Sequence, residues 1–194
     1  LKEKIQMAGY AVILVAEAAQ IQIANRLLWE CRNVTADARI LEVGIGSGMI
    51  AMQLAPCCKT YSGRDISKIV LDKLDGMAKE RKMNNLRLYP YAADEIYHIQ
   101  EKFDIILMSS VTEYFSGYNY LRKVIERCIE QIDGKGVILF ADIFDLDKKD
   151  SYRQSVYQYA KAHPGVRYKR DFSHELFIPH EYWKDIANQF PQIT

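Results

Sequence analysis

The sequence predicts an α/β fold in which a mostly parallel sheet is covered by helices on both faces. Three observations support this expectation. Apolar segments rich in β-branched residues alternate along the chain with segments of helical character. These apolar segments are continuous, as in strands that are buried on both faces. A glycine-rich loop directly follows the first core strand, at the carboxyl edge where sheets of this class bind ligands.

The composition indicates one soluble globular domain. The chain has 194 residues, 49% of them hydrophobic, and its 26 basic and 25 acidic residues leave a net charge of +1. This balance lacks the basic footprint of a nucleic-acid-binding protein, so we expect no nucleic-acid partner. The four cysteines show no CxxC pair and no Cys/His ligand spacing, which predicts reduced thiols in a cytoplasmic protein.

The first part of the chain has a helical pattern. Apolar residues recur at helical spacing over residues 3–32, so we predict a helical cap at 1–33. The apolar run 7–16 within it follows two lysines and resembles a signal peptide. The run is far too short to span a bilayer, so we interpret it as a core helix and expect no membrane association.

The rest of the chain alternates strands and helices. The predicted elements are strand 39–43, a helix from 49, strand 60–63, helix 67–82, strand 86–91, strand 103–109, helix 118–132 and strand 137–141. Ser67 stands where it serves as the N-cap of the second helix. Residues 38–145 therefore form the predicted cofactor-binding core.

A loop with three glycines follows the first core strand. Gly44, Gly46 and Gly48 come shortly after Glu42, and glycines there let the backbone turn sharply and approach a ligand. A dinucleotide-binding loop needs its third glycine one residue later. Met49 occupies that position, which disfavours a dinucleotide-dependent oxidoreductase.

Acidic residues follow the next two strands. Asp65 lies about 20 residues after the first glycine, where a carboxylate accepts both hydroxyls of a ribose. Asp65 could instead belong only to the cap of the following helix, but spacing and context favour the ribose. Asp94 follows strand 86–91 and is either a second ligand-binding acid or a surface acid in a loop.

The series of motifs resembles a known family. Glu-x-Gly-x-Gly-x-Gly at 42–48 resembles the first motif of class I S-adenosylmethionine-dependent methyltransferases, which have a Rossmann-like fold. SVTEYF at 110–115 and ELFIP at 175–179 resemble segments of the methyltransferase domains embedded in nonribosomal peptide synthetases, and the match runs from about residue 38 to 190. Ser109 and Glu113 stand where that family has Asn and Gln. The family adds two strands beyond residue 194, so we expect the terminal strands of the sheet to be missing.

The resemblance implies S-adenosylmethionine as cofactor, S-adenosylhomocysteine as product, and no metal, because Ser109 and Ser110 are not the acidic ligands of metal-dependent catechol-type enzymes. The position of Asp94 contacts the adenine amino group in the family, and the residue before it lines the ring. The implied cofactor-binding residues are Glu42, Gly44, Gly46, Gly48, Asp65, Ile66, Ala93, Asp94, Ser109 and Ser110.

The resemblance also implies a reaction, the methylation of the α-amine of an aminoacyl residue held as a thioester on a carrier protein. Glu113 and His174 are the candidate catalytic residues, and Tyr114 and Asp142 are candidates for the acceptor pocket. Residues 146–194 would form the acceptor side of a domain within a larger multidomain chain.

Two alternatives stay open at this point. A free-standing N-, O- or C-methyltransferase of small molecules would share the same core. A non-catalytic scaffold would need a partner at the open sheet edge that missing strands leave. The intact Glu42, Asp65 and loop glycines argue against the scaffold.

Overall fold

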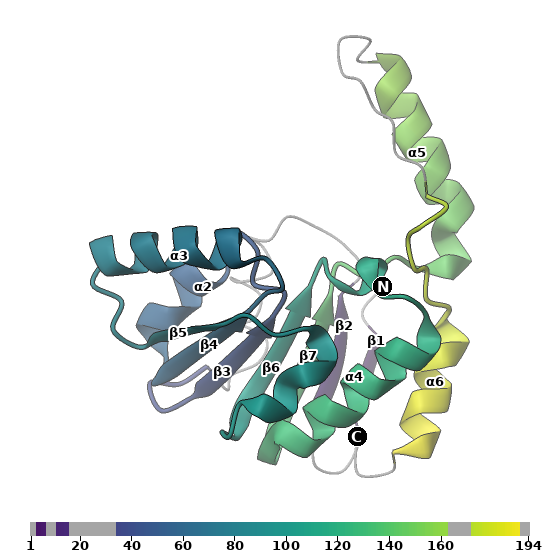
Figure 1. Cartoon of the computed structure of the whole chain (residues 1–194). Coiled ribbons are helices and arrows are strands. Elements are labelled where there is room, and N and C mark those ends of the chain that lie inside the picture. The colour runs from purple at the N-terminus through teal and green to yellow at the C-terminus, as the bar shows by residue number, and fades with distance from the viewer. Residues whose placement is uncertain (1–2, 7–10, 16–33, 163–171, 191–194) are drawn as a thin grey trace.

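The computed structural model describes residues 3–6, 11–15, 34–162 and 172–190. Seven strands in these ranges form one sheet in the order β1-β2-β7-β6-β3-β4-β5 (Figure 1). They are β1 (Glu3–Gln6), β2 (Ala11–Val15), β3 (Arg39–Val43), β4 (Thr60–Arg64), β5 (Leu86–Tyr89), β6 (Phe103–Ser109) and β7 (Ile132–Ala141). The described helices are α2 (Ala51–Leu54), α3 (Lys68–Glu80), α4 (Tyr118–Gln131), α5 (Lys149–Ala162), α6 (His180–Gln189) and the 3-10 turns η1 (Ala55–Cys57), η2 (Ala93–His98), η3 (Thr112–Tyr114) and η4 (Leu146–Lys148).

The order of the strands reverses beside β3. From β3 the chain adds β4 and β5 on one side, then crosses over to add β6 and β7 on the other, and these five strands are parallel. The crevice outside the carboxyl ends of β3 and β6 is therefore the topological switch point, where open α/β sheets bind ligands. The predicted fold class is confirmed, and β3 begins and ends at the predicted residues.

Helices cover both faces of the sheet, and each face has its own apolar core. On one face, Leu54 of α2 and Leu74 of α3 pack against β3 and β4. On the other, Val124 of α4 and Trp183 of α6 pack against β6 and β7. Figure 1 shows the two groups of helices on opposite sides of the sheet. Because both faces are buried, the central strands need the continuous apolar sequences from which they were predicted.

The predicted helix over 3–32 is wrong where the structure describes this segment. Residues 3–6 and 11–15 are strands, and 16–33 lie outside the described residues. β2 pairs in parallel with β7, with Ala11 opposite Val137, and β1 pairs antiparallel with β2. The sequence of β2, AVILV, is a continuous and mainly β-branched run, which favours a strand once a partner strand is available. The edge of β7 is thus paired with β2 rather than open.

The C-terminal part adds two helices in different positions. α5 projects away from the body of the domain (Figure 1) and has no buried residue. α6 packs against the sheet through Trp183 and Ile186. None of the helices in the described ranges combines the length and apolar character needed to cross a membrane.

Candidate active site

The glycine loop turns directly above the end of β3. The backbone N–H groups of Gly44 and Ile45 donate to the carbonyl of Arg64, 2.8 and 2.9 Å away, which ties the loop to the end of β4. Gly44 has φ +75°, and a Cβ there would collide with the side chain of Val111. Gly46 has φ +50°, and a Cβ there would meet only the carbonyl oxygen of Gly44, at 4.0 Å. The first glycine is required by packing, whereas the second leaves space for a ligand.

A cavity of about 720 Å³ opens at the switch point. Its walls come from the loops that follow four strands: residues 42–46, 64–67, 91–93 and 109–111. A cavity of this size accommodates a nucleoside with a short side chain and lies where the fold predicts a ligand.

Asp65 connects two walls of the cavity. Its Oδ2 accepts a hydrogen bond from the N–H of Gly46 at 3.1 Å, and its Oδ1 accepts one from the N–H of Ser67 at 2.9 Å. Ser67 occupies the N-cap position of α3 as predicted but makes no side-chain capping bond. The carboxylate is therefore fixed on the cavity wall, with acceptor capacity left for ligand hydroxyls.

Glu42 lies buried on the wall nearest β3. The hydroxyl of Tyr61 donates to its Oε2 at 2.6 Å. Burial raises the pKa of Glu42 to about 8, although the bond from Tyr61 acts in the opposite direction. A carboxyl group in this state is largely protonated at neutral pH and ionises readily when a cation binds beside it.

The ends of β6 and β7 form a polar corner of the site. Ser109 lines the cavity, and its buried Oγ has no hydrogen-bond partner among the described residues. Ser110 also lines the cavity and donates from Oγ to Oδ2 of Asp142 at 2.6 Å. An unsatisfied buried hydroxyl on a cavity wall fits a bound polar ligand.

The third predicted acid is engaged elsewhere. The carboxylate of Asp94 accepts hydrogen bonds from the hydroxyl of Tyr120 at 2.8 Å and from Nζ of Lys123 at 2.7 Å. The bond from Lys123 is the main reason why the pKa of Asp94 is lowered. Ala93 and Tyr120 line the cavity, whereas Asp94 is not among the lining residues.

The other candidates divide between the cavity and its surroundings. Ile66 and Tyr114 line it and are 79% and 74% exposed. Gly48 packs against α3 instead. Glu113 is buried in η3, where its carbonyl accepts from the N–H of Leu176 at 2.9 Å. His174 is exposed and, like Glu113, is not among the residues that line the cavity. The catalytic roles of Glu113 and His174 stay predictions.

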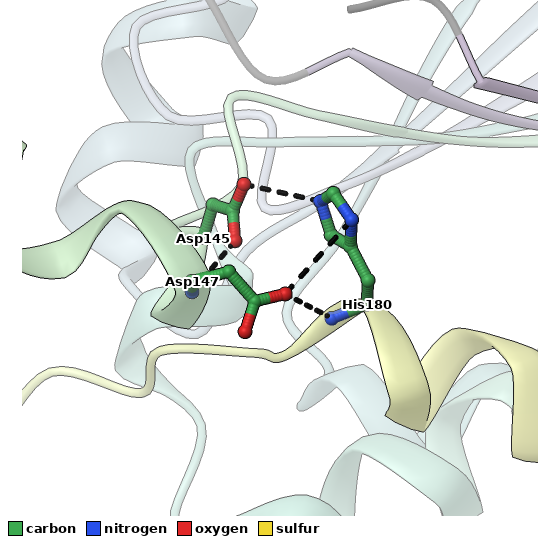
Figure 2. A group of neighbouring side chains, drawn as sticks. All are labelled: Asp145, Asp147 and His180. Carbon is green, nitrogen blue, oxygen red and sulfur yellow. Dashed lines mark hydrogen bonds and ion pairs between the residues drawn. The ribbon is translucent and has the colours of Figure 1, made fainter.

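A group of side chains outside the cavity was not predicted. Figure 2 shows Asp145 and Asp147 next to each other and facing His180, and these three are the residues of the described ranges whose spacing would suit a metal ion. Nε2 of His180 lies 3.1 Å from Oδ2 of Asp145, and Nδ1 lies 3.9 Å from Oδ2 of Asp147. Asp147 also accepts from the backbone N–H of His180 at 3.1 Å. Both carboxylates already interact with His180, and these contacts join η4 to the start of α6.

Fold and cavity together define the class of protein. A glycine loop at the switch point, a fixed carboxylate directly after the neighbouring strand and a buried hydroxyl on the cavity wall without a partner in the described ranges indicate an α/β domain that binds a nucleoside-containing cofactor. Residues 41–138 match a family described as "Methyltransferase domain". The chain belongs to this methyltransferase family, and its cofactor is S-adenosylmethionine.

The chain is similar to several known proteins. Chondramide synthase of Chondromyces crocatus is 30% identical over 80% of this chain, and a nonribosomal peptide synthetase of Alternaria alternata is 31% identical over 54%. The alignments span only 4% and 2% of those two proteins. The solved structure of YcgJ from Bacillus subtilis has the same fold, with a TM-score of 0.66 and 18% identity, and the match covers 87% of this chain and 67% of YcgJ.

Proposed function

We propose that this domain methylates the α-amine of an aminoacyl group that a carrier protein holds as a thioester, within a multidomain peptide synthetase. The observation that carries the proposal is the similarity to synthetases over 54% to 80% of the chain. The order of the motifs over residues 103–115 and 174–179 supports it.

The cavity residues suit the separate parts of the cofactor. Asp65 would accept the ribose hydroxyls, with Ile66 against the adenosine and Ala93 beside the ring. Glu42 and Ser109 would hold the methionine end, because a buried carboxyl attracts an ammonium group and a buried hydroxyl lacks a partner. The bound cofactor supplies an electrophilic methyl group, so the protein has mainly to align the acceptor and exclude water.

The acceptor would enter beside η3. Tyr114 stands exposed at the cavity rim, and the Ser110–Asp142 pair lies at the neighbouring strand ends. In this arrangement Asp142 orients the amine, and Ser110 holds the carboxylate of Asp142 in place. Glu113 and His174 would act as acid–base groups only through closure of the segment around Leu176, which already hydrogen-bonds to η3.

The test compares three acceptors that carry the same amino acid: an aminoacyl carrier protein, a small aminoacyl thioester and the free amino acid. Each is incubated with the domain and S-adenosylmethionine, and mass spectrometry detects the gain of one methylene. Methylation of the carrier-bound group alone supports the proposal. Equal methylation of the free amino acid would assign a small-molecule enzyme, and cofactor binding without transfer to any acceptor would favour a scaffold.

A further inference from the structure

Arg64 is a buried cation to which the cofactor contacts proposed above assign no role. It is the last residue of β4 and is 0% exposed. Its Nη1 donates to the carbonyl of Ala93 over 3.4 Å, a long hydrogen bond. Nε and Nη2 are buried without any hydrogen-bond partner among the described residues.

Within the described ranges, no carboxylate forms an ion pair with Arg64. The nearby carboxylate of Asp94 is bonded to Tyr120 and Lys123, and that of Glu95 accepts from the N–H of Ala92 at 2.8 Å. Burial consequently lowers the pKa of Arg64 to about 10. A buried cation with two unused donor groups is costly to folding. Its retention therefore calls for a ligand that accepts hydrogen bonds.

The position of Arg64 identifies where that ligand lies. Arg64 lines the cavity together with Tyr91, Ala93 and Tyr120. Its bond to Ala93 places the guanidinium directly behind the wall beside which the proposed function puts the adenine ring, and a ligand there meets Nε and Nη2 when the buried side chain turns toward the cavity. The group recognised here must offer hydrogen-bond acceptors, because a guanidinium has donors only, and a planar heterocycle suits donors that lie in one plane.

We propose that Arg64 is a specificity-determining residue of the cofactor site, whose Nε and Nη2 donate to ring nitrogens of the adenine. This inference rests on the proposed placement of the adenine beside Ala93. Three ring nitrogens of adenine are free to accept: N1, N3 and N7. The alternative is a purely structural role, in which Arg64 only stabilises the turn at Ala93. That role would not depend on any hydrogen-bond acceptor of the ligand.

The experiment is a calorimetric titration with S-adenosylhomocysteine and its 1-deaza, 3-deaza and 7-deaza analogues. We expect the wild type to lose about tenfold to a hundredfold in affinity for at least one analogue, as for a hydrogen bond to a charged donor. Arg64→Met, which keeps the length and removes the donors, should bind the parent compound more weakly by a similar factor and should no longer distinguish that analogue from it. Arg87→Met on neighbouring β5, where Arg87 pairs with Glu101 at the surface, is the matched control and should behave as the wild type.

Two results would overturn the proposal. One is a wild type that binds the parent compound and all three analogues equally well. The other is an Arg64→Met variant that discriminates among them as the wild type does, which would leave Arg64 a structural role only. Arg64→Gln replaces the methionine variant if the latter does not fold. Because the readout is cofactor binding, a failure of methyl transfer to the carrier with this discrimination intact would reject the proposed acceptor and leave the role of Arg64 standing.

Discussion

Ser110 and Asp142 end the neighbouring strands β6 and β7 in the same unusual way. Both have φ +55°, a left-handed conformation that residues other than glycine seldom adopt, and Oγ of Ser110 donates to Oδ2 of Asp142 at 2.6 Å. The hydrogen bond joins two strained residues, of which Ser110 lines the cofactor cavity. Strain of this kind persists at functional sites because the surrounding structure enforces it.

Replacing Asp142 should separate catalysis from cofactor binding. Asp142→Asn retains a residue that tolerates positive φ but removes the negative charge. We expect methyl transfer to slow by about tenfold or more, because the acceptor is no longer oriented, while affinity for S-adenosylhomocysteine stays unchanged. Steady-state rates and calorimetry measure the two effects, and Asp150→Asn in exposed α5 is the control. An unchanged rate would rule out the role of Asp142.

Removal of the Asp65 carboxylate should mainly weaken binding. Asp65→Ala loses the charged acceptor for the ribose hydroxyls, which should reduce affinity for S-adenosylhomocysteine by about 1.5–3 kcal/mol. Asp72→Ala, on the exposed side of α3, should leave affinity unchanged. If Asp65→Ala binds as tightly as the wild type in calorimetry, the ribose lies elsewhere.

Two glycines with similar backbones allow strain and steric blockage to be compared. Gly46 and Gly134 have φ +50° and +54°, and neither has packed neighbours that a Cβ would strike. An alanine at either position should lower the free energy of unfolding by about 1–2 kcal/mol, the cost of left-handed backbone. Only Gly46→Ala should also abolish cofactor binding, since Gly46 lines the cavity. Denaturant unfolding and calorimetry on both variants make the comparison. Equal cofactor affinity in the two would show that the ligand does not approach Gly46.

Glu42 should make the ligand-free domain sensitive to pH. Its pKa in the folded state is about 8, above the ordinary value of 4.5, so the unfolded chain releases this proton first as the pH rises. The contribution to stability is complete below about pH 4.5 and is lost progressively until the pH passes about 8. We expect Glu42→Gln to flatten this part of the pH profile of unfolding free energy, and Glu80→Gln, at the exposed end of α3, to leave it unchanged. A wild-type profile without a decline between these values would mean that Glu42 ionises normally.

The parts of the fold that sequence could predict are those governed by local pattern. β3 and β6 are mainly apolar runs, and the glycine loop after β3 and Asp65 after β4 follow at a fixed spacing, so the cavity could be located in advance. That residues 11–15 form strand β2 could not be predicted, because the partner strand β7 is remote in sequence and the same apolar residues also suit a helix.

The partners of individual side chains could not be predicted from the local sequence pattern either. Asp94 was assigned from its place after a strand, but Tyr120 and Lys123 of α4 determine where its carboxylate points. The one local signal for Arg64 was a charged residue at the end of a predicted strand, directly before Asp65. Only the packed structure shows that Nε and Nη2 of its guanidinium have no hydrogen-bond partner within the described ranges.

The pairing of β2 with β7 also bears on how the domain is made. During synthesis, residues 11–15 leave the ribosome long before residues 137–141, to which they bind in the finished sheet. The five-stranded parallel core contains mostly pairings between neighbours or near neighbours in the chain, so it can assemble as it emerges. Among the described parallel strands, β2 is therefore translated first and is the last that can take its place, and its apolar sequence must stay available without aggregating for the whole interval.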